Sequence, residues 1–232
     1  MRDKAYQYLH KKIRSGELPA GAALSEASLA RELGTSRTPL REAVGQLAAE
    51  GFLRQNPNGG SVVVEFSKRD IAELYELREA LEGYAVAKAA EHDLRPADLT
   101  TLQQSVTEIQ DLRAELEQSG ERWLNPAQME RFVGLDMRFH STLVRSAANR
   151  RMLKVVVDAR VLLNIFAMRR QGHDAGLLNE VHRYHNEVLN AVCRKDPEAA
   201  TRLLLEHIRV SKLERLRDYE EWELEKVMGE NP

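Results

Sequence analysis

Cysteine and long apolar runs are almost absent from this sequence. Cys193 is the only cysteine among 232 residues, so no internal disulfide can form, as is usual in a reducing compartment. No apolar run approaches the ~18 residues that a membrane-spanning helix needs. The first ten residues are charged and amphipathic, and they lack the apolar core of a secretory signal. We therefore expect a cytoplasmic protein that does not enter a membrane.

Aromatic residues are few and charged residues are many. Aromatics make up 6% of the chain and charged residues 30%, a composition typical of helix-rich globular proteins. The net charge of −2 is unevenly distributed, because residues 1–68 carry ten Lys and Arg against seven Asp and Glu. The head therefore has a net charge of +3 and the remainder −5. A basic head on an acidic body is compatible with nucleic-acid binding by the head alone.

One stretch, residues 35–52, organises the N-terminal part of the chain. Ser36 is a suitable N-cap, and Pro39 falls in the first turn, where its missing N–H has no helical partner to lose. The apolar residues that follow recur at helical spacing, whereas hydroxyls and two arginines occupy the other side of the first turns. Such a helix suits docking against phosphates and guanine edges, but an ordinary capped surface helix has the same pattern.

The flanking segments place this stretch in a larger motif. Helical patterns cover residues 3–15 and 26–33, and a glycine separates the second pattern from the stretch just described. Two short helices joined by a turn that contains glycine form the helix-turn-helix pattern. Two strand candidates, residues 52–55 and 61–65, flank a turn rich in Asn, Pro and Gly. In this order the elements predict a winged helix-turn-helix domain over residues 1–67.

These motifs resemble the GntR family of bacterial transcription regulators. The resemblance covers roughly residues 3–66, and the run Ser-Arg-Thr-Pro-Leu-Arg-Glu-Ala at 36–43 is its most specific part. The other matching residues are Leu24, Ser25, Glu26, the run 29–34, Leu47, the run 50–53 and Gly60. Membership of this family implies binding to double-stranded operator DNA.

The resemblance also implies a role for individual residues of the N-terminal module. Arg37 and Arg41 would lie near bases or the DNA backbone, and Ser36 and Thr38 near phosphates. Gly60 would let the wing approach the minor groove.

The module departs from the family pattern in two places. Ala27 stands where many members carry a basic residue, and the wing has Asn58 and Gly59 where an arginine or lysine is often found. Fewer basic contacts predict weaker non-specific affinity for DNA.

The rest of the sequence, residues 68–232, predicts an all-helical body. The predicted helices are 68–90, 96–118, 126–146, 152–170, 177–194 and 197–227. On the first of them, apolar residues recur in register at Leu74, Leu77, Leu81, Tyr84 and Ala85. No strand candidate follows Val64, and the short connections favour antiparallel neighbours in a bundle of about six helices. The predicted fold class is therefore mainly α, with a winged helix-turn-helix followed by an all-α antiparallel bundle.

Four polar residues fall on apolar faces of the predicted bundle helices. Asp136 and His140 are one turn apart, and His185 and His207 lie in the apolar registers of two other helices. Burying these groups without partners would cost several kcal/mol. A divalent metal would satisfy all four, since carboxylate and neutral imidazole are common ligands. Each histidine could equally be a core residue bonded to a carbonyl or carboxylate, and spacing alone does not decide between these interpretations.

The body resembles the FCD domain, the effector-binding domain of the FadR subfamily of GntR regulators. The resemblance covers roughly residues 68–220, and its matching motifs are 77–82, 136–140, 185–191, 196–200 and His207. In metal-binding members an Asp and three His coordinate the ion. This implies that Asp136, His140, His185 and His207 are ligands here, with zinc as the expected ion and nickel or manganese as alternatives.

Arg78 falls in the first matching motif of the body. The resemblance implies that its planar guanidinium binds a carboxylate of the effector, while a surface salt bridge with Glu82 is the alternative interpretation. His182 lies one turn before His185 but matches no ligand position, so we expect it either to support a ligand or to lie at the rim. The histidines that receive no role, because they fall in exposed or loop contexts, are His10, His92 and His173.

The sequence therefore predicts a homodimeric, ligand-responsive transcription regulator, more often a repressor in this family. Two winged modules would bind a palindromic operator, and a small carboxylate effector would bind at a metal centre in the body. One alternative is the same regulator with a metal-free site for an acyl or amino-acid effector. A metal-dependent hydrolase is a further alternative, but no general base is evident beyond the ligands, so we expect no enzymatic activity. A winged-helix scaffold for protein contacts is the last alternative.

Overall fold

The computed structural model describes residues 1–14, 17–56, 60–65, 67–167 and 173–229. The elements in chain order are α1 (Arg2–Arg14), β1 (Ala23–Leu24), α2 (Glu26–Leu33), α3 (Arg37–Ala49), β2 (Leu53–Gln55), β3 (Ser61–Val63), α4 (Lys68–Glu91), α5 (Pro96–Ser119), α6 (Pro126–Ser146), α7 (Arg150–Ala167), α8 (Ala175–Cys193) and α9 (Pro197–Gly229). They form two compact units, residues 1–67 with 161–169, and residues 68–160 with 170–232. The described helices include none with an apolar stretch that could span a bilayer.

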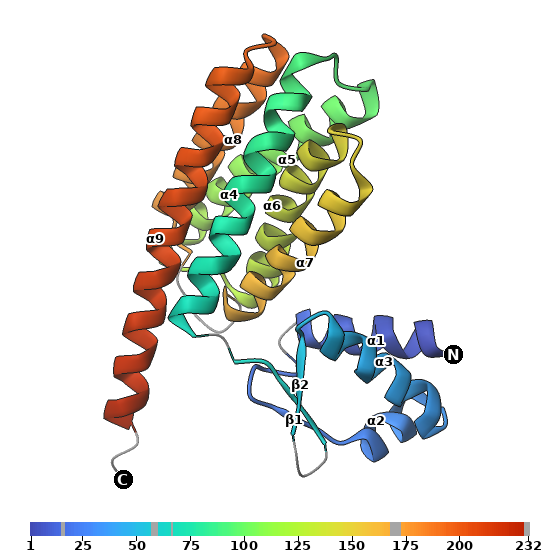
Figure 1. Cartoon of the computed structure of the whole chain (residues 1–232). Helices are drawn as coiled ribbons and strands as arrows, with labels where there is room; N and C mark the ends of the chain where they lie inside the picture. The colour runs from blue at the N-terminus through green and yellow to red at the C-terminus, as the bar shows by residue number, and fades with distance from the viewer. Residues whose placement is uncertain (15–16, 57–59, 66, 168–172, 230–232) are drawn as a thin grey trace. The chain divides into compact units, whose positions relative to one another are not determined.

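The first unit has the predicted winged helix-turn-helix elements, with one strand more than expected (Figure 1). Ser25 caps α2 by accepting from the backbone N–H of Ser28 at 3.3 Å, and Gly34 ends the helix at φ +65°, in the left-handed region. The sheet has the order β1-β3-β2, with both pairings antiparallel. Strand β1 has only two residues, too few for an alternating pattern to be recognised in the sequence.

Strand β2 begins one residue later than predicted, after a turn that separates it from helix α3. The helix stops at Ala49 because Gly51 takes a left-handed conformation at φ +83°. Its N–H donates to the carbonyl of Ala48 at 3.1 Å, which turns the chain towards β2.

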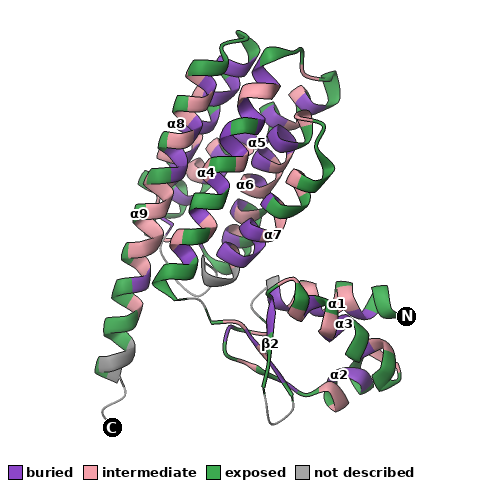
Figure 2. Ribbon diagram, in the orientation of Figure 1, coloured by how far each residue is buried: buried purple, intermediate pink, exposed green. Residues whose placement is uncertain are grey.

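The second unit contains the helices α4 to α9 (Figure 1). Helix α4 packs along α9, while α5 packs against α6 and α8. Local sequence explains the sharp helix starts. Asn125 and Gln128 form a capping box at the start of α6, and Asp196 accepts from the N–H of Ala199 before Pro197 opens α9. Buried residues lie on the faces that these helices turn towards one another (Figure 2).

The predicted helices of the body agree with the observed ones to within about two residues at the ends that the structure describes; the predicted residues 168–170 lie outside the described part. The apolar face predicted for α4 is wrong in part. Leu77 and Tyr84 are exposed, at 38% and 54%, whereas Arg78 and Glu82 are buried. The buried face of α4 therefore carries an ion pair, which a search for apolar periodicity cannot find.

Candidate metal centre and nucleic-acid interface

The N-terminal end of α3 presents the residues that we expected to meet DNA. Ser36, Arg37 and Thr38 are all exposed on the first turn. Ser36 occupies the N-cap position, but its hydroxyl makes no capping hydrogen bond. Among the described residues, Arg37 has no side-chain partner. Hydroxyls and a guanidinium that are not engaged within the chain can bind phosphates or base edges.

Two other predicted DNA contacts have a different setting. Arg41 is exposed, and its Nε donates to a carboxylate oxygen of Glu26 on α2 at 3.0 Å. Gly60 is exposed and takes φ +84°, a conformation that favours glycine. The wing residues Asn58 and Gly59 lie outside the described part of the chain.

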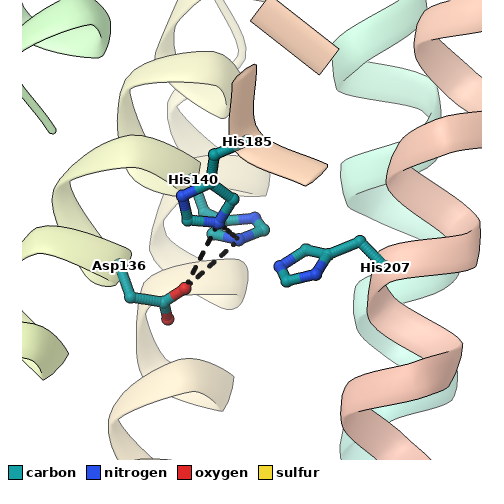
Figure 3. A group of neighbouring side chains, drawn as sticks. All are labelled: Asp136, His140, His185 and His207. Carbon is teal, nitrogen blue, oxygen red and sulfur yellow. Dashed lines mark hydrogen bonds and ion pairs between the residues drawn. The ribbon is translucent and has the colours of Figure 1, made fainter. Parts of the chain in front are cut away.

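The second unit brings together the four residues that we predicted as metal ligands. Asp136 and His140 come from α6, His185 from α8 and His207 from α9, and their side chains point towards one another (Figure 3). One potential ligand atom from each residue lies within 4.8 Å of the others. The three imidazoles are buried, and the Asp136 side chain is 20% exposed. Such a set of donors around one point suits a divalent cation.

The hydrogen bonding of the imidazoles provides a test of this fit. His140 Nδ1 lies 2.6 Å from a carboxylate oxygen of Glu82, which can only accept, so in the neutral ring Nε2 carries the lone pair. This Nε2 lies 3.2 Å from His185 Nε2, and each of the two nitrogens lies 3.5 Å from Asp136 Oδ1. The other nitrogen of His185, Nδ1, is buried without a partner in the described structure.

No tautomer of His185 satisfies this arrangement. If its Nε2 carries hydrogen, Nδ1 is an unsatisfied buried acceptor; if Nδ1 carries it, two lone pairs face each other at Nε2. A cation held by His140, His185 and Asp136 would accept these lone pairs and so remove the repulsion. The residues present therefore fit a divalent metal.

Two arginines and a glutamate surround this cluster. The Glu82 carboxylate accepts from Arg78 Nε at 2.7 Å and from Arg160 Nη1 at 3.2 Å. Arg160 also pairs with Asp136 through Nη2. The side chains of Arg78, Arg160 and Glu82 are exposed by 5% or less, so Arg78 does pair with Glu82, but in the interior and not on the surface.

The pKa values of Glu82, Asp136 and His185 are all lowered in this network. Burial raises the pKa of Glu82, but the charges of Arg78, His140 and Arg160 outweigh it and hold the pKa well below its usual value. Burial likewise raises the pKa of Asp136, and the charge of Arg160 and the contacts with His140 and His185 outweigh it and hold the pKa well below its usual value. Burial lowers the pKa of His185 to about 4. The acids are therefore ionised and this imidazole is neutral near pH 7.

His207 behaves like His185, since burial and its two imidazole neighbours hold its pKa well below the usual value. His182, which we expected to support a ligand or to lie at the rim, is partly buried and is not a member of the cluster.

Sequence reasoning missed three residues near the cluster. Arg160 and Glu82 were not assigned, although the 77–82 motif contains the glutamate; Arg160 carries no motif that would identify it. His173 lies in a loop, as expected, but its side chain is only 8% exposed and packs against Phe132, with 4.8 Å between ring centroids. Phe132 precedes Asp136 by one helical turn on α6. Spacing could not identify His173, because it lies outside any helix.

Comparison with known proteins assigns both units to described families. Residues 1–63 match the family described as bacterial regulatory proteins, gntR family, and residues 73–210 match the FCD domain. An uncharacterized HTH-type transcriptional regulator in an unstable DNA locus of Streptomyces ambofaciens is 32% identical, over 91% of this chain and 84% of its own. A probable D-xylose utilization operon transcriptional repressor of Paenarthrobacter nicotinovorans is 29% identical, over 87% of this chain and 82% of its own.

A solved structure shares the fold. The structure of E. coli McbR/YncC superposes with a TM-score of 0.78 at 24% sequence identity, over 94% of this chain and 98% of that one.

Proposed function

Because the chain belongs to the GntR family of bacterial regulatory proteins and carries an FCD domain, it is a transcriptional regulator and not an enzyme, and we propose that it represses an operon in response to a small organic acid bound at a metal centre. Residues 1–67 would form the DNA-binding domain and residues 68–232 the effector-binding and dimerisation domain. A homodimer would place two winged modules on a palindromic operator.

One observation carries the metal-centre proposal: the convergence of one carboxylate and three imidazoles on a common point. Asp136, His140, His185 and His207 would hold the ion, and three neutral nitrogens with one carboxylate oxygen suit zinc, with nickel or manganese as alternatives. When bound, the ion would supply a Lewis-acidic position at which a carboxylate of the effector can bind. The relative named as a repressor supports the sign of regulation.

Arg78 would bind the effector carboxylate beside the ion. Its Nε donates to Glu82 and its guanidinium lies over the Tyr75 ring, 4.9 Å from the centroid, whereas its two terminal nitrogens make no hydrogen bond to the described residues. The side chain is 5% exposed, and a buried guanidinium with unpaired N–H groups gains most from an anionic ligand. The paired fork of an arginine would also orient the carboxylate.

Effector binding would change the relative populations of dimer arrangements that fit the operator half-sites. An effector can shift this equilibrium only by its difference in affinity between the arrangements. A coupling of 1–3 kcal/mol, typical of allosteric proteins, would change operator affinity by about 5- to 150-fold.

Metal analysis of the protein purified without chelator tests the centre. We expect stoichiometric metal in the wild-type protein and its loss in His185→Ala, because that change removes one of four ligands. His182→Ala is the matched control, since His182 lies one turn earlier on α8 and is not a member of the cluster. Unchanged metal content in His185→Ala would contradict the proposal.

The same regulator without metal is the second candidate, and the unsatisfied Nδ1 of His185 favours it too, because an effector could bond to that atom directly. A thermal-shift screen of organic acids with and without chelator separates the two. Stabilisation that disappears with chelator supports the metal centre, and stabilisation that persists supports the metal-free site.

A further inference from the structure

Glu82 connects the candidate metal centre to the two buried arginines. We propose that Glu82 is a positioning residue that sets the tautomer and orientation of His140 for metal binding. This inference rests on the proposed metal centre and adds to it a residue outside the ligand set. Glu82 lies on α4, which contributes no ligand to the cluster.

The contact between Glu82 and His140 determines which nitrogen is available to the ion. Glu82 Oε2 lies 2.6 Å from His140 Nδ1, and both side chains are exposed by 1% or less. The carboxylate accepts the Nδ1 hydrogen, so the Nε2 lone pair is directed at Asp136 and His185. A carboxylate on the second ring nitrogen also makes the ligating nitrogen more basic, which strengthens its bond to a metal.

The two arginines keep the Glu82 carboxylate in place. Its other oxygen, Oε1, accepts from Arg78 Nε at 2.7 Å and from Arg160 Nη1 at 3.2 Å. A rotation that broke the bond to His140 would also break these charge-assisted bonds in the interior. Arg160 also pairs with Asp136. One guanidinium therefore aligns both Glu82, which positions His140, and Asp136, which is itself a proposed ligand.

The other two imidazoles have no such support. The Nδ1 atom of His185 is buried without a partner, and His207 has ring contacts but no hydrogen bond among the described residues. Among the described residues, His140 is therefore the one imidazole of the cluster whose Nδ1, the nitrogen turned away from Asp136, is held by a carboxylate. Loss of Glu82 should act on the centre through His140 specifically.

The first test measures zinc affinity by competition with a chromophoric chelator on the full-length protein. Glu82→Gln keeps an acceptor but removes the charge, and Glu82→Leu removes both. We expect zinc affinity to fall about 10-fold in the first variant and about 100-fold in the second, the range found when a residue that supports a metal ligand is removed. Glu79→Gln is the matched control, because Glu79 lies on α4 and pairs with Arg209 outside the cluster; it should bind zinc within twofold of wild type.

The outcomes separate this inference from the metal centre itself. Wild-type affinity in Glu82→Gln overturns the role of Glu82 and leaves the centre standing, whereas absence of zinc uptake by the wild-type protein overturns both. The Co²⁺-substituted proteins add a spectroscopic readout: Glu82→Gln should alter the visible absorption bands, and Glu79→Gln should leave them unchanged.

A second measurement needs no variant of Glu82, in case loss of this buried charge prevents folding. Nitrogen NMR of the metal-free wild-type protein distinguishes the two tautomers of a histidine. We expect His140 as the Nδ1–H tautomer, with its signals assigned by comparison with His140→Gln. If His140 is instead the Nε2–H tautomer, its Nδ1 has no hydrogen for Glu82 to accept, and the inference is overturned.

Discussion

The two units of this regulator prepare their binding groups in opposite ways. In the N-terminal module, the first turn of α3 leaves Arg37 and Thr38 exposed, and the module's core lies behind them. In the body, the corresponding groups are buried and bonded to one another: Glu82 alone joins two arginines and a histidine. The module therefore displays its charges on a stable scaffold, whereas the charges of the body are part of the scaffold.

This difference affects what each site can tolerate. An exposed arginine costs little to remove, because water solvates whatever remains. A buried charge whose partner is removed loses its compensation and stays in the interior, which is expensive. We expect substitutions in the module to change DNA affinity without changing stability, and substitutions in the body to change both.

Arg160→Met should have the largest effect. It leaves Glu82, which is 1% exposed, and Asp136, which is 20% exposed, each with one cation fewer. Breaking a buried ion pair in this way typically costs 3–5 kcal/mol, so we expect a loss of about 3 kcal/mol in the free energy of unfolding of the metal-free protein. Urea denaturation of the full chain measures it.

Arg209→Met is the control for that substitution. Arg209 is 62% exposed and pairs with Glu79 at 2.9 Å, so its removal should cost less than about 1 kcal/mol. An equal cost for the two variants would mean that the buried network is no more demanding than a surface pair, and the contrast between the units would fail.

Arg37→Ala is expected to give the next largest effect, on DNA binding and not on stability. Loss of a guanidinium from the first turn of α3 should weaken binding to the operator about 100-fold, or about 2.7 kcal/mol. The free energy of unfolding should change by less than about 0.5 kcal/mol, because the side chain is exposed. A mobility-shift series with upstream DNA measures the affinity, with the exposed Lys4→Ala on α1 as the control. Wild-type operator affinity in Arg37→Ala would show that this stretch does not read DNA.

The burial of His173 in the body predicts how the free energy of unfolding depends on pH. Burial first, and then the charge of Arg215, lower its pKa from 6.5 to about 3. Between these values the unfolded chain binds a proton that the folded one does not. Stability is therefore lost as pH falls below about 6.5, by up to about 1.4 kcal/mol per pH unit from this group. His173→Gln should reduce that slope, whereas His92→Gln, at an exposed position, should not. Equal slopes in the wild-type and His173→Gln proteins would contradict the burial of His173.

The sequence predicts the secondary structure well where a local signal marks it, and less well where buried partners decide it. Three helices of the body begin at prolines where the sequence predicted them to begin, Pro96, Pro126 and Pro197, and the helix α3 followed from one contiguous run. Strand β1 was missed because a strand of two residues shows no periodicity. The buried face of α4 was predicted wrongly in part, because apolar spacing predicts burial for Leu77 and cannot predict it for the ion pair of Arg78 and Glu82.

The candidate sites show the same limit. The four-residue cluster was found because its members break apolar registers, and the structure brings all four together. Arg160 and His173 were missed because their significance depends on tertiary contacts with Asp136, Glu82 and Phe132, from helices far away in the sequence. A sequence predicts groups that interrupt a local pattern better than groups that complete a network in space.

Glu26→Gln should give the smallest effect. It tests a carboxylate that contacts a predicted DNA-binding arginine of the module, as Glu82 contacts His140 in the body. Arg41 Nε contacts Glu26 at 3.0 Å, but the two side chains are 67% and 25% exposed, so the pair contributes at most about 1 kcal/mol. If Arg41 leaves this carboxylate to reach a phosphate, removing the negative charge should tighten binding to a non-specific duplex about two- to fivefold, most clearly at low salt.

Fluorescence anisotropy over a salt series measures that change, with Glu32→Gln as the control, because Glu32 lies on the same helix but pairs with Lys12. Weaker binding in Glu26→Gln would mean that Glu26 holds Arg41 in the orientation that meets DNA. A carboxylate of the module would then orient a DNA-binding arginine, as Glu82 is proposed to orient His140. Both units would use a carboxylate to position a binding group, and they would differ only in how deeply that carboxylate is buried.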